Sequence, residues 1–314
     1  MKKILLSFIL LLNCIYENSI YFKGEYNTII LSSGNLTRAK DLIKKNLEII
    51  QFTPREEKIL NVFDIDSLEK KDKFLYKHYI IVSTPSSDNF KLFKEIFKDI
   101  KESGIYFRND PFLRGSFIVG IYGEKEEEIL NIISKKGDLI FNTFYDKIIA
   151  DLRKIAYFPG ERKEFSERVF KKIGLKIKVP KGYRLFKEGE DYIIFNTNYP
   201  DRFVMFWKIN SKVHLVPEKV VELRNKIAKT VYAGDSVLTN FVNYKYLNLD
   251  NKKALYVTGA WGNFSLKIGG GFESLVFEKN GKTYFIDIGI YEPKKWKLKF
   301  LKIMESWAFY IENE

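Results

Sequence analysis

The stretch from Val257 to Phe309 constrains the fold more than any other part of this chain, because three β-rich runs are followed there by an amphipathic one. Asn280-Gly281 separates the second and third runs, and Asn-Gly between β-rich runs is a strong signal for a hairpin turn. Pro293 ends the third run, since proline has no N–H to donate to a strand ladder. The sequence therefore predicts three antiparallel strands followed by a helix.

The predicted helix runs from Pro293 to Ile311. Its large apolar residues recur at spacings of four, three and four, which places them on one face. We expect this face to pack across the strands around Trp261 and Tyr284, because an uncovered apolar sheet would aggregate. The face consists of Trp296, Phe300, Ile303 and Trp307, and the residues expected largely off it are Lys297, Lys299, Lys302 and Glu305.

A known family pattern is matched in this region by Gly259, Trp261, Gly269, Gly270, Phe272, Tyr291, Pro293, Lys295, Lys297 and Glu305. The region thereby resembles the domain of unknown function 4837 family, whose members are uncharacterised cell-envelope lipoproteins of Gram-negative bacteria. Gly271 and Thr258 depart from the pattern, in which proline and arginine are usual. Looser matches at Pro54, Glu57 and Phe63 extend the expected resemblance over the whole chain. The resemblance implies an envelope location and a fold, but no reaction.

The composition predicts a folded chain with a sizeable core. Its 314 residues suit one large or two medium domains, and 46% of them are hydrophobic. The formal net charge is +13, but most of the positive residues are lysines that alternate with glutamates. Arginine, the usual reader of phosphates and bases, is sparse. We interpret the charge as a solvated surface, with an anionic partner as the alternative, and we expect no nucleic-acid partner.

The first residues have the pattern of a secretory signal peptide. Lys2 and Lys3 precede an apolar run, Ile4 to Leu12, which at nine residues is too short to span a membrane. Cys14 is the only cysteine of the chain, and it lies one residue past this run. The segment 11–14, Leu-Leu-Asn-Cys, resembles a lipobox, in which the cysteine thiol takes a diacylglyceryl group and becomes the new N-terminus.

We therefore predict that Cys14 is lipidated and that the chain is a membrane-anchored lipoprotein of the cell envelope, on the periplasmic side or at the outer membrane. Two alternatives stay open at this point. Ordinary signal cleavage within 16–19 would leave no anchor, and Cys14 could be a chance small hydrophobe within the leader.

Alternating β-like and helix-like runs divide the chain into two halves. Residues 1–19 are the predicted signal peptide and lipid-anchored tether, 20–157 an N-terminal α+β half, and 158–314 a C-terminal α+β half. The predicted fold class is α+β, with two similar halves joined by a helical middle segment. In each half we expect an antiparallel sheet that is covered by helices on one face.

The sequence contains no Walker A, dinucleotide-binding or serine-hydrolase motif. The run Gly269-Gly270-Gly271 lies between predicted strands, so a bulge or wide turn is the simpler interpretation and a binding surface the alternative. The glutamates at 124–128 suit a helix start better than a metal cluster, because consecutive side chains point around a helix. His78 and His214 lie far apart, and no Cys/His ligand set exists after Cys14. We expect no metal, no other cofactor and no catalytic residues.

Two groups of residues are weaker candidates for a site. Asp64 and Asp66 are two residues apart on a predicted strand, so they would share a face and could bind a cation or act as acid and base. A solvent-facing pair is the simpler interpretation. Trp207, Tyr199 and Phe203 could line a sugar- or lipid-binding groove, although most aromatic residues of this chain must lie in the core.

Two hypotheses of function follow. The first is a lipid-anchored envelope protein without catalysis, which binds or scaffolds an envelope protein or glycan. The second is an envelope hydrolase that uses paired carboxylates such as Asp64, Asp66 or Glu273, without metal or histidine. A cleft in which two carboxyls converge would favour the enzyme, whereas an apolar patch or an open groove would favour binding. We prefer the first hypothesis.

Overall fold

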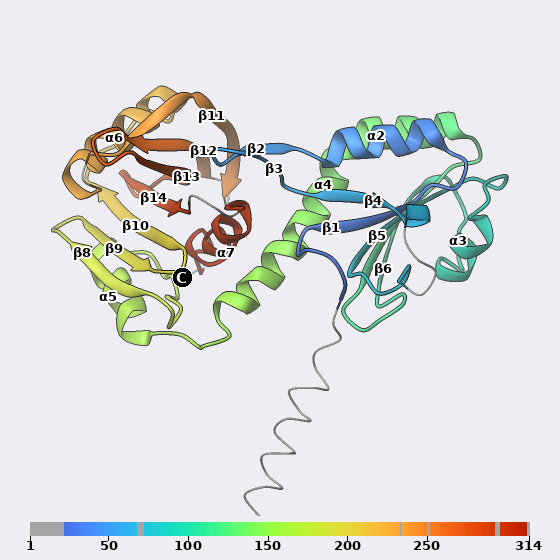
Figure 1. The fold of residues 1–314 in the computed structure, drawn as a ribbon, viewed down its shortest axis with the longest axis horizontal. Helices are drawn as coiled ribbons and strands as arrows, with labels where there is room; N and C mark the ends of the chain where they lie inside the picture. Colours follow the sequence, from blue (N-terminus) through green and yellow to red (C-terminus); the bar gives the residue numbers. More distant parts are fainter. Residues whose placement is uncertain (1–21, 68–71, 233, 250–251, 293–295, 313–314) are drawn as a thin grey trace, which may run out of the picture. The chain divides into compact units, whose positions relative to one another are not determined.

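A computed structural model describes residues 22–67, 72–232, 234–249, 252–292 and 296–312 (Figure 1). The chain forms two compact units. Unit 1 consists of the described residues of Met1–Ile49 and Ile59–Tyr145, and unit 2 of those of Ile50–Lys58 and Asp146–Glu314. Cys14 and the rest of the predicted leader lie outside the described residues. None of the described helices is long and apolar enough to cross a membrane.

Unit 1 is built on a five-stranded sheet with the order β4-β1-β5-β7-β6. Its strands are β1 (Thr28–Ser32), β4 (Asn61–Asp64), β5 (His78–Ser83), β6 (Gly104–Asn109) and β7 (Phe117–Tyr122). The pairs β1–β4, β1–β5 and β5–β7 are parallel, and only β6 pairs with its neighbour in antiparallel fashion. The α+β class and the two sheet-containing halves are confirmed, but the predicted antiparallel sheet of the first half is wrong. The physical reason is burial: β1, β5 and β7 are buried at every position, as parallel strands covered on both faces are.

Helices cover both faces of this sheet. They are α2 (Thr37–Leu47), α3 (Phe90–Ile96) and α4 (Glu126–Ala156), the last kinked at Lys136. On one face, α3 packs with Ile30, Tyr79 and Ile118 in a hydrophobic cluster. On the other, Phe144 of α4 lies with its ring edge-on to the rings of His78 and Phe117. The expectation of helices on one face only is therefore wrong for this half.

Unit 2 contains a seven-stranded antiparallel sheet with the order β11-β12-β13-β14-β10-β9-β8 (Figure 1). Its strands are β8 (Arg184–Glu188), β9 (Tyr192–Thr197), β10 (Asp201–Ile209), β11 (Ser236–Leu249), β12 (Lys252–Asn263), β13 (Ile268–Lys279) and β14 (Lys282–Tyr291). The three strands expected from Val257 onward are β12, β13 and β14. Asn280 and Gly281 form the turn between the last two, both with positive φ, as a tight hairpin requires.

The sheet of unit 2 also has helices on both faces. Its helices are α5 (Lys163–Ile173), α6 (Pro217–Val231) and α7 (Leu298–Ala308). One face forms a hydrophobic cluster with α5 and α7, and the opposite face forms a second cluster with α6. The one-face expectation is therefore wrong here too, since consecutive residues of β9, β10 and β14 are buried on alternating sides. The two halves are not alike, because one sheet is mainly parallel and the other antiparallel.

Helix α7 closes the core of unit 2, but not with the whole predicted face. It begins at Leu298, and Trp296, which precedes it, is 63% exposed. Phe300 and Ile303 are only half-buried, whereas Trp307 is fully buried. The buried face consists of Leu298, Leu301, Lys302, Met304, Ser306, Trp307 and Ala308. The helix packs on the side of the sheet that carries Tyr284, as expected, whereas Trp261 lies on the α6 side.

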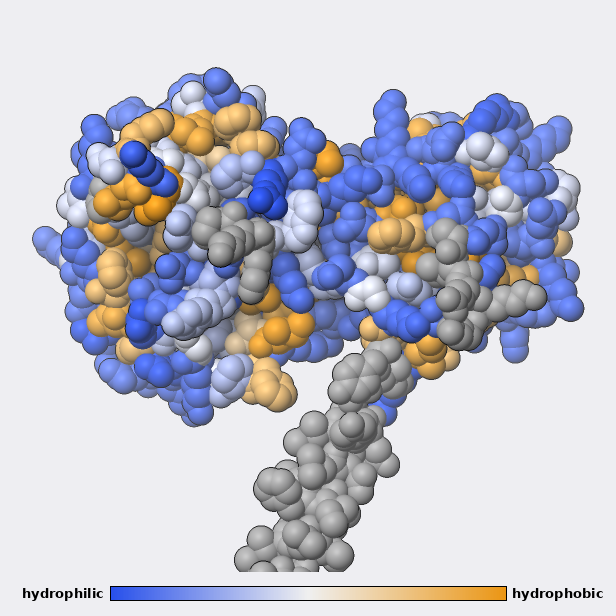
Figure 2. Space-filling model, in the orientation of Figure 1, coloured by the Kyte–Doolittle hydropathy of each residue, from blue (hydrophilic) through white to orange (hydrophobic). Residues whose placement is uncertain are grey.

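A short hairpin from the N-terminal half of the sequence belongs to unit 2. It comprises β2 (Ile50–Phe52) and β3 (Glu56–Lys58), which pair in antiparallel fashion. Phe52 stacks on Phe241 of β11, with ring centroids 4.0 Å apart. The C-terminal core is thus completed by residues about two hundred positions earlier in the chain. On the face drawn in Figure 2, hydrophilic residues cover most of each unit, and smaller hydrophobic areas are scattered among these residues.

Candidate functional site

The carboxylates proposed from the sequence belong to different elements and to different units. Asp64 ends β4 and pairs with Lys40, whereas Asp66 lies in the 3-10 helix Ile65–Ser67 and pairs with Lys73. The two residues are therefore not on one strand, and the expectation that they share its face is wrong. Burial disfavours the charged form of Asp64, but hydrogen bonds from Lys40 and from the backbone outweigh this and lower its pKa. Glu273, the third candidate, belongs to unit 2.

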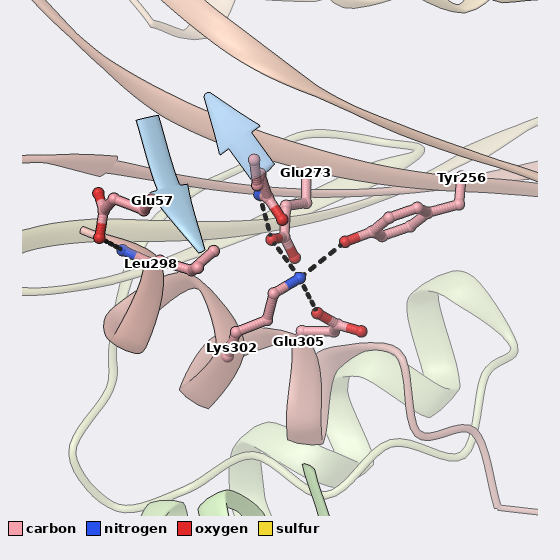
Figure 3. Close-up of polar contacts among 7 residues, drawn as sticks. Glu57, Tyr256, Glu273, Leu298, Lys302 and Glu305 are labelled. Carbon is pink, nitrogen blue, oxygen red and sulfur yellow. Dashed lines mark hydrogen bonds and ion pairs between the residues drawn. The ribbon is translucent and has the colours of Figure 1, made fainter. Parts of the chain in front are cut away.

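Glu273 is part of a buried polar network between β13 and α7 (Figure 3). The Lys302 ammonium, 2% exposed, donates to Glu273 at 2.9 Å, to Glu305 at 2.8 Å and to the Tyr256 hydroxyl at 3.1 Å. Gln51 of β2 donates to the same Glu273 oxygen at 2.8 Å. Burial raises the pKa of Glu273 to about 7, although Lys302 and Gln51 favour its charged form.

This network holds the N-terminal hairpin to the C-terminal helix. The Glu57 carboxylate accepts the backbone N–H groups of Lys297 and Leu298 at 2.9 and 3.0 Å, which satisfies orphan donors at the start of α7. Glu273 is fully buried, and its second oxygen has no hydrogen-bond partner among the described residues. A substrate cannot reach such a group without local opening, so we assign the network a structural role.

A pocket of about 450 Å³ lies instead on the α6 side of the sheet of unit 2. It is at the end of the sheet where β9, β12 and β14 finish and β8, β10 and β13 begin. Five aromatic residues form what we call its aromatic wall. Four come from separate strands and one directly follows α6: Phe186, Phe203, Trp261, Tyr291 and Tyr232. Val231, Leu266 and Ile268 extend this apolar lining.

Two glycines leave the room that the aromatic wall needs. Phe203 of β10 pairs with Gly289 of β14, and a Cβ on Gly289 would overlap the Phe203 ring. Trp261 of β12 pairs with Gly270 of β13, where a Cβ would overlap the backbone of β14 and approach the indole nitrogen. Gly270 lies within β13 and pairs regularly there, so the expected bulge or wide turn at 269–271 is wrong. The glycines are needed for close approach, not for a turn.

The rest of the pocket lining is polar. Its residues come mainly from the β9–β10 hairpin and are Asn196, Thr197, Asn198, Asp201, Arg202 and Asp235. Arg184 donates to the side-chain oxygens of Asn196 and Asn198 at 2.9 and 2.8 Å, which fixes both amides. Asp201 pairs across the ladder with Tyr291, so both side chains are on the pocket side of the sheet.

Two residues of the lining, Tyr232 and Asp235, have shifted pKa values. Asp235 is buried and accepts a hydrogen bond from Asn263 at 3.0 Å; burial raises its pKa, while Asn263 and Arg224 oppose the rise. Burial, together with the charge of Asp287, also raises the pKa of Tyr232 well above its usual range.

Arg224 and Asp287, whose charges act on Tyr232 and Asp235, form a fully buried ion pair. Arg224 of α6 donates through Nε to Asp287 of β14 at 3.0 Å, and Ser274 donates to the same carboxylate oxygen at 2.5 Å. The guanidinium lies 4.0 Å from the centroid of the Phe272 ring. Its two terminal nitrogens and the Tyr232 hydroxyl find no hydrogen-bond partner among the described residues. Polar groups with shifted pKa values beside an apolar pocket are a common feature of ligand sites.

The comparison with known families concerns this unit. Residues 162–309 match the family model described as Domain of unknown function (DUF4837). This segment is a DUF4837 domain. The match confirms the resemblance proposed from the sequence, although it does not extend over the whole chain: unit 1 and the β2–β3 hairpin lie outside it. Every residue that lines the pocket lies within the DUF4837 domain, and two of them, Trp261 and Tyr291, carry the resemblance.

No curated protein matches the chain. Solved structures that match in part include one from Bacteroides thetaiotaomicron VPI-5482, with 5% identity and a TM-score of 0.26, over 41% of this chain and 42% of that one. Another is the cyanobacterial PsbP protein, CyanoP, from Synechocystis sp. PCC 6803, with 12% identity, a TM-score of 0.29, and coverage of 42% and 82%. A third is PA94, a protein of unknown function from Pseudomonas aeruginosa, with 10% identity, a TM-score of 0.24, and coverage of 36% and 75%.

Sequence reasoning found part of the pocket. Phe203, suggested for a sugar- or lipid-binding groove, lies in the aromatic wall of the DUF4837 domain. Tyr199 is 95% exposed, between the pocket residues Asn198 and Asp201, whereas Trp207 lies farther along β10 against Phe285. Asp201, Asp235 and Tyr232 were missed. A usable signal was present for Asp201, since a polar Asn-Tyr-Pro-Asp turn at the end of a hairpin places a carboxylate at a sheet edge.

Among the residues that the structure describes, no group of three or more His, Cys, Asp or Glu side chains could hold a metal ion. The pocket has instead the properties of a site for an organic ligand. It combines apolar walls with a few fixed polar groups, which is the usual composition of such sites.

Proposed function

We propose that this protein is a lipid-anchored, non-catalytic binding protein of the cell envelope, and that its DUF4837 domain holds a small organic ligand in the pocket. The observation that carries the proposal is the pocket itself. Its volume of about 450 Å³ falls within the range of about 300–1,000 Å³ typical of small-molecule sites. Its aromatic side chains come from four strands of one sheet and from the residue that follows α6, so a ligand would find the pocket largely pre-formed.

A ligand screen on the detergent-solubilised full-length protein tests this proposal. Thermal unfolding, followed in the presence of small metabolites and soluble envelope fragments, reports any compound that binds the folded state. In Leu266→Trp, a larger side chain at the rim should block the pocket and abolish the stabilisation. Phe264→Trp changes the same loop at an exposed residue outside the lining, so it should respond as the wild type does. Equal responses of wild type and Leu266→Trp would place any binding elsewhere.

The anchor is the second part of the proposal. Cys14 follows a short apolar run in a lipobox-like context, which favours a diacylglyceryl modification and a membrane as the partner of the N-terminus. The folded units would then present the pocket to an envelope glycan or protein, or to a small molecule, at that membrane. Mass spectrometry of the N-terminal peptide from the native protein should find a lipidated Cys14. An unmodified peptide that starts downstream of Cys14 would refute the anchor.

A hydrolase is the second candidate, and one observation favours it. Asp201 and Asp235 line the same pocket, and burial raises the pKa of Asp235, which would suit Asp235 to the role of a general acid. Incubation with envelope glycans and esters, followed by product analysis, separates the two functions. The binding proposal predicts no product from the wild type. Turnover that disappears in Asp235→Asn would establish the hydrolase.

A further inference from the structure

We propose that the ligand of this pocket is an organic cation, recognised through an alkylated ammonium group that sits among the aromatic side chains and close to Asp201. This inference rests on the proposed function of the pocket as a ligand site. It adds the chemical class of the ligand.

Three of the aromatic residues that line the pocket contact one another. The Phe203 ring lies 4.2 Å from the Tyr232 ring and 6.4 Å from the Trp261 ring, measured between centroids, and the ring planes are inclined by 39° and 59°. At these distances the three rings pack against one another, so a ligand reaches only the parts of them that line the pocket. The face of each ring is the negative side of a quadrupole, so a cation held against this aromatic lining is attracted electrostatically. Quaternary ammonium groups are commonly recognised by aromatic side chains.

The carboxylates support a positive ligand. Asp201 lies next to Tyr291 in the ladder, on the pocket side of the sheet, and no ion pair to Asp201 occurs within the described part of the chain. A carboxylate without an ion-pair partner beside apolar walls favours a ligand that supplies the positive charge. This acidic group stands out in a chain whose formal net charge is +13.

The neighbouring arginines are engaged elsewhere. Arg202 belongs to the pocket lining, but it is one residue on from Asp201, so its side chain leaves the opposite face of the strand, and its guanidinium lies 5.3 Å from the Phe300 ring. Arg184 is directed at the side-chain oxygens of Asn196 and Asn198. Neither contact directs a guanidinium at the aromatic wall. The charge of the buried Arg224 guanidinium is offset by Asp287 at 3.0 Å, so this pair adds no net positive charge beside the pocket.

Isothermal titration calorimetry on the detergent-solubilised full-length protein tests the charge. The probes are choline and its uncharged carbon isostere, in which a tert-butyl group replaces the trimethylammonium group. Both have nearly the same shape, so a difference in affinity reports the positive charge. We expect choline to bind at least about tenfold more tightly than the isostere, a difference of about 1.4 kcal/mol.

Two charge-neutralising variants locate the effect. Asp201→Asn should weaken choline binding by about tenfold and leave the binding of the isostere unchanged. Glu190→Gln removes the same charge from the β8–β9 turn at the opposite end of β9, and its affinities should equal those of the wild type. Asp201 is exposed, so its replacement should not disturb folding, which unchanged thermal unfolding without ligand would verify.

The outcomes separate the two proposals. Equal affinity for choline and the isostere, or binding of a monosaccharide but of neither probe, overturns the cation while the pocket remains a ligand site. Failure of choline to bind at millimolar concentration also overturns the cation. Binding that persists unchanged in Leu266→Trp overturns the ligand function of the pocket itself.

Discussion

Replacement of two tryptophans near the C-terminus tests how unit 2 is held together. The sequence pattern places Trp296 and Trp307 on one helical face, whereas the structure leaves Trp296 63% exposed and buries Trp307 completely. Trp307→Ala should therefore destabilise unit 2 severely, and Trp296→Ala should have a small effect. The two variants change the same residue type within about three helical turns of each other.

The expected magnitudes follow from the contacts. Trp307 packs against Tyr183 at 4.8 Å and Phe206 at 6.1 Å between ring centroids, and truncation of such a buried aromatic to alanine costs about 3–5 kcal/mol. Trp296 has the Arg55 guanidinium 5.9 Å from its ring, an exposed cation–π contact worth about 0.5–1 kcal/mol. The free energies of unfolding of the two variants should thus differ by at least about 2 kcal/mol.

Urea unfolding followed by tryptophan fluorescence measures this difference. All four tryptophans, Trp207, Trp261, Trp296 and Trp307, belong to unit 2, so the signal reports that unit alone. Each variant keeps three of them, and a shift in midpoint at constant slope gives the change in stability. Equal midpoints for Trp307→Ala and Trp296→Ala would refute the assignment of α7 as a core helix, and its aromatic residues would then have to face a partner.

Three further outcomes are expected. Glu57→Ala should lower the free energy of unfolding of unit 2 by about 1–2 kcal/mol in the same urea assay, because it leaves two N–H groups at the start of α7 without their acceptor. An unchanged midpoint would show that the β2–β3 hairpin does not cap the helix. Because burial raises the pKa of Glu273 from 4.5 to about 7, the folded protein binds more protons than the unfolded chain between these values, so the free energy of unfolding should fall as pH rises through this window. Glu273→Gln should flatten that fall, and identical pH profiles of variant and wild type would contradict the raised pKa. Cys14→Ser should move the protein from the membrane fraction to the soluble fraction of lysed cells, whereas an unchanged distribution would argue against a lipid anchor at this residue.

The local sequence pattern was enough to predict the C-terminal strands and the presence of the helix that follows them. Asn280-Gly281 specifies its turn within two residues, and β12, β13 and β14 are neighbours both in sequence and in the sheet. The helical face was only half right, because the pattern does not say where the helix begins. With Leu298 as its first residue, Trp296 lies before the helix and Lys302 turns inward.

The partners of Lys302 lie beyond the reach of local pattern. A lysine in an amphipathic helix is normally solvated, and its burial here depends on Glu273 in another strand, with Gln51 on the same carboxylate from a hairpin far earlier in the chain. The parallel sheet of unit 1 could have been predicted from the sequence. Apolar runs such as 29–31 and 79–82 show no alternation of polar and apolar residues, which is typical of parallel strands buried on both faces.

The pocket could be anticipated only in fragments. Trp261 and Tyr291 stood out through the family resemblance, and Phe203 was suggested, with Trp207 and Tyr199, for a sugar- or lipid-binding groove. Nothing in the sequence places Phe203, Trp261 and Tyr291 together. The ladder does so, by pairing Phe203 with Gly289 and Trp261 with Gly270, so that large rings lie over residues without side chains. Asp235, which directly precedes β11, joins them through tertiary structure alone.

The most direct measurement of the ligand-binding account is an analysis of what the protein carries in its own cells. Wild type and Leu266→Trp would be isolated from the native envelope under identical conditions and denatured, and the released small molecules compared by liquid chromatography and mass spectrometry. The account predicts an organic compound, bearing an ammonium group, that is released from the wild type in near-stoichiometric amount and is absent from Leu266→Trp. Identical released compounds from both proteins would contradict a ligand site in this pocket.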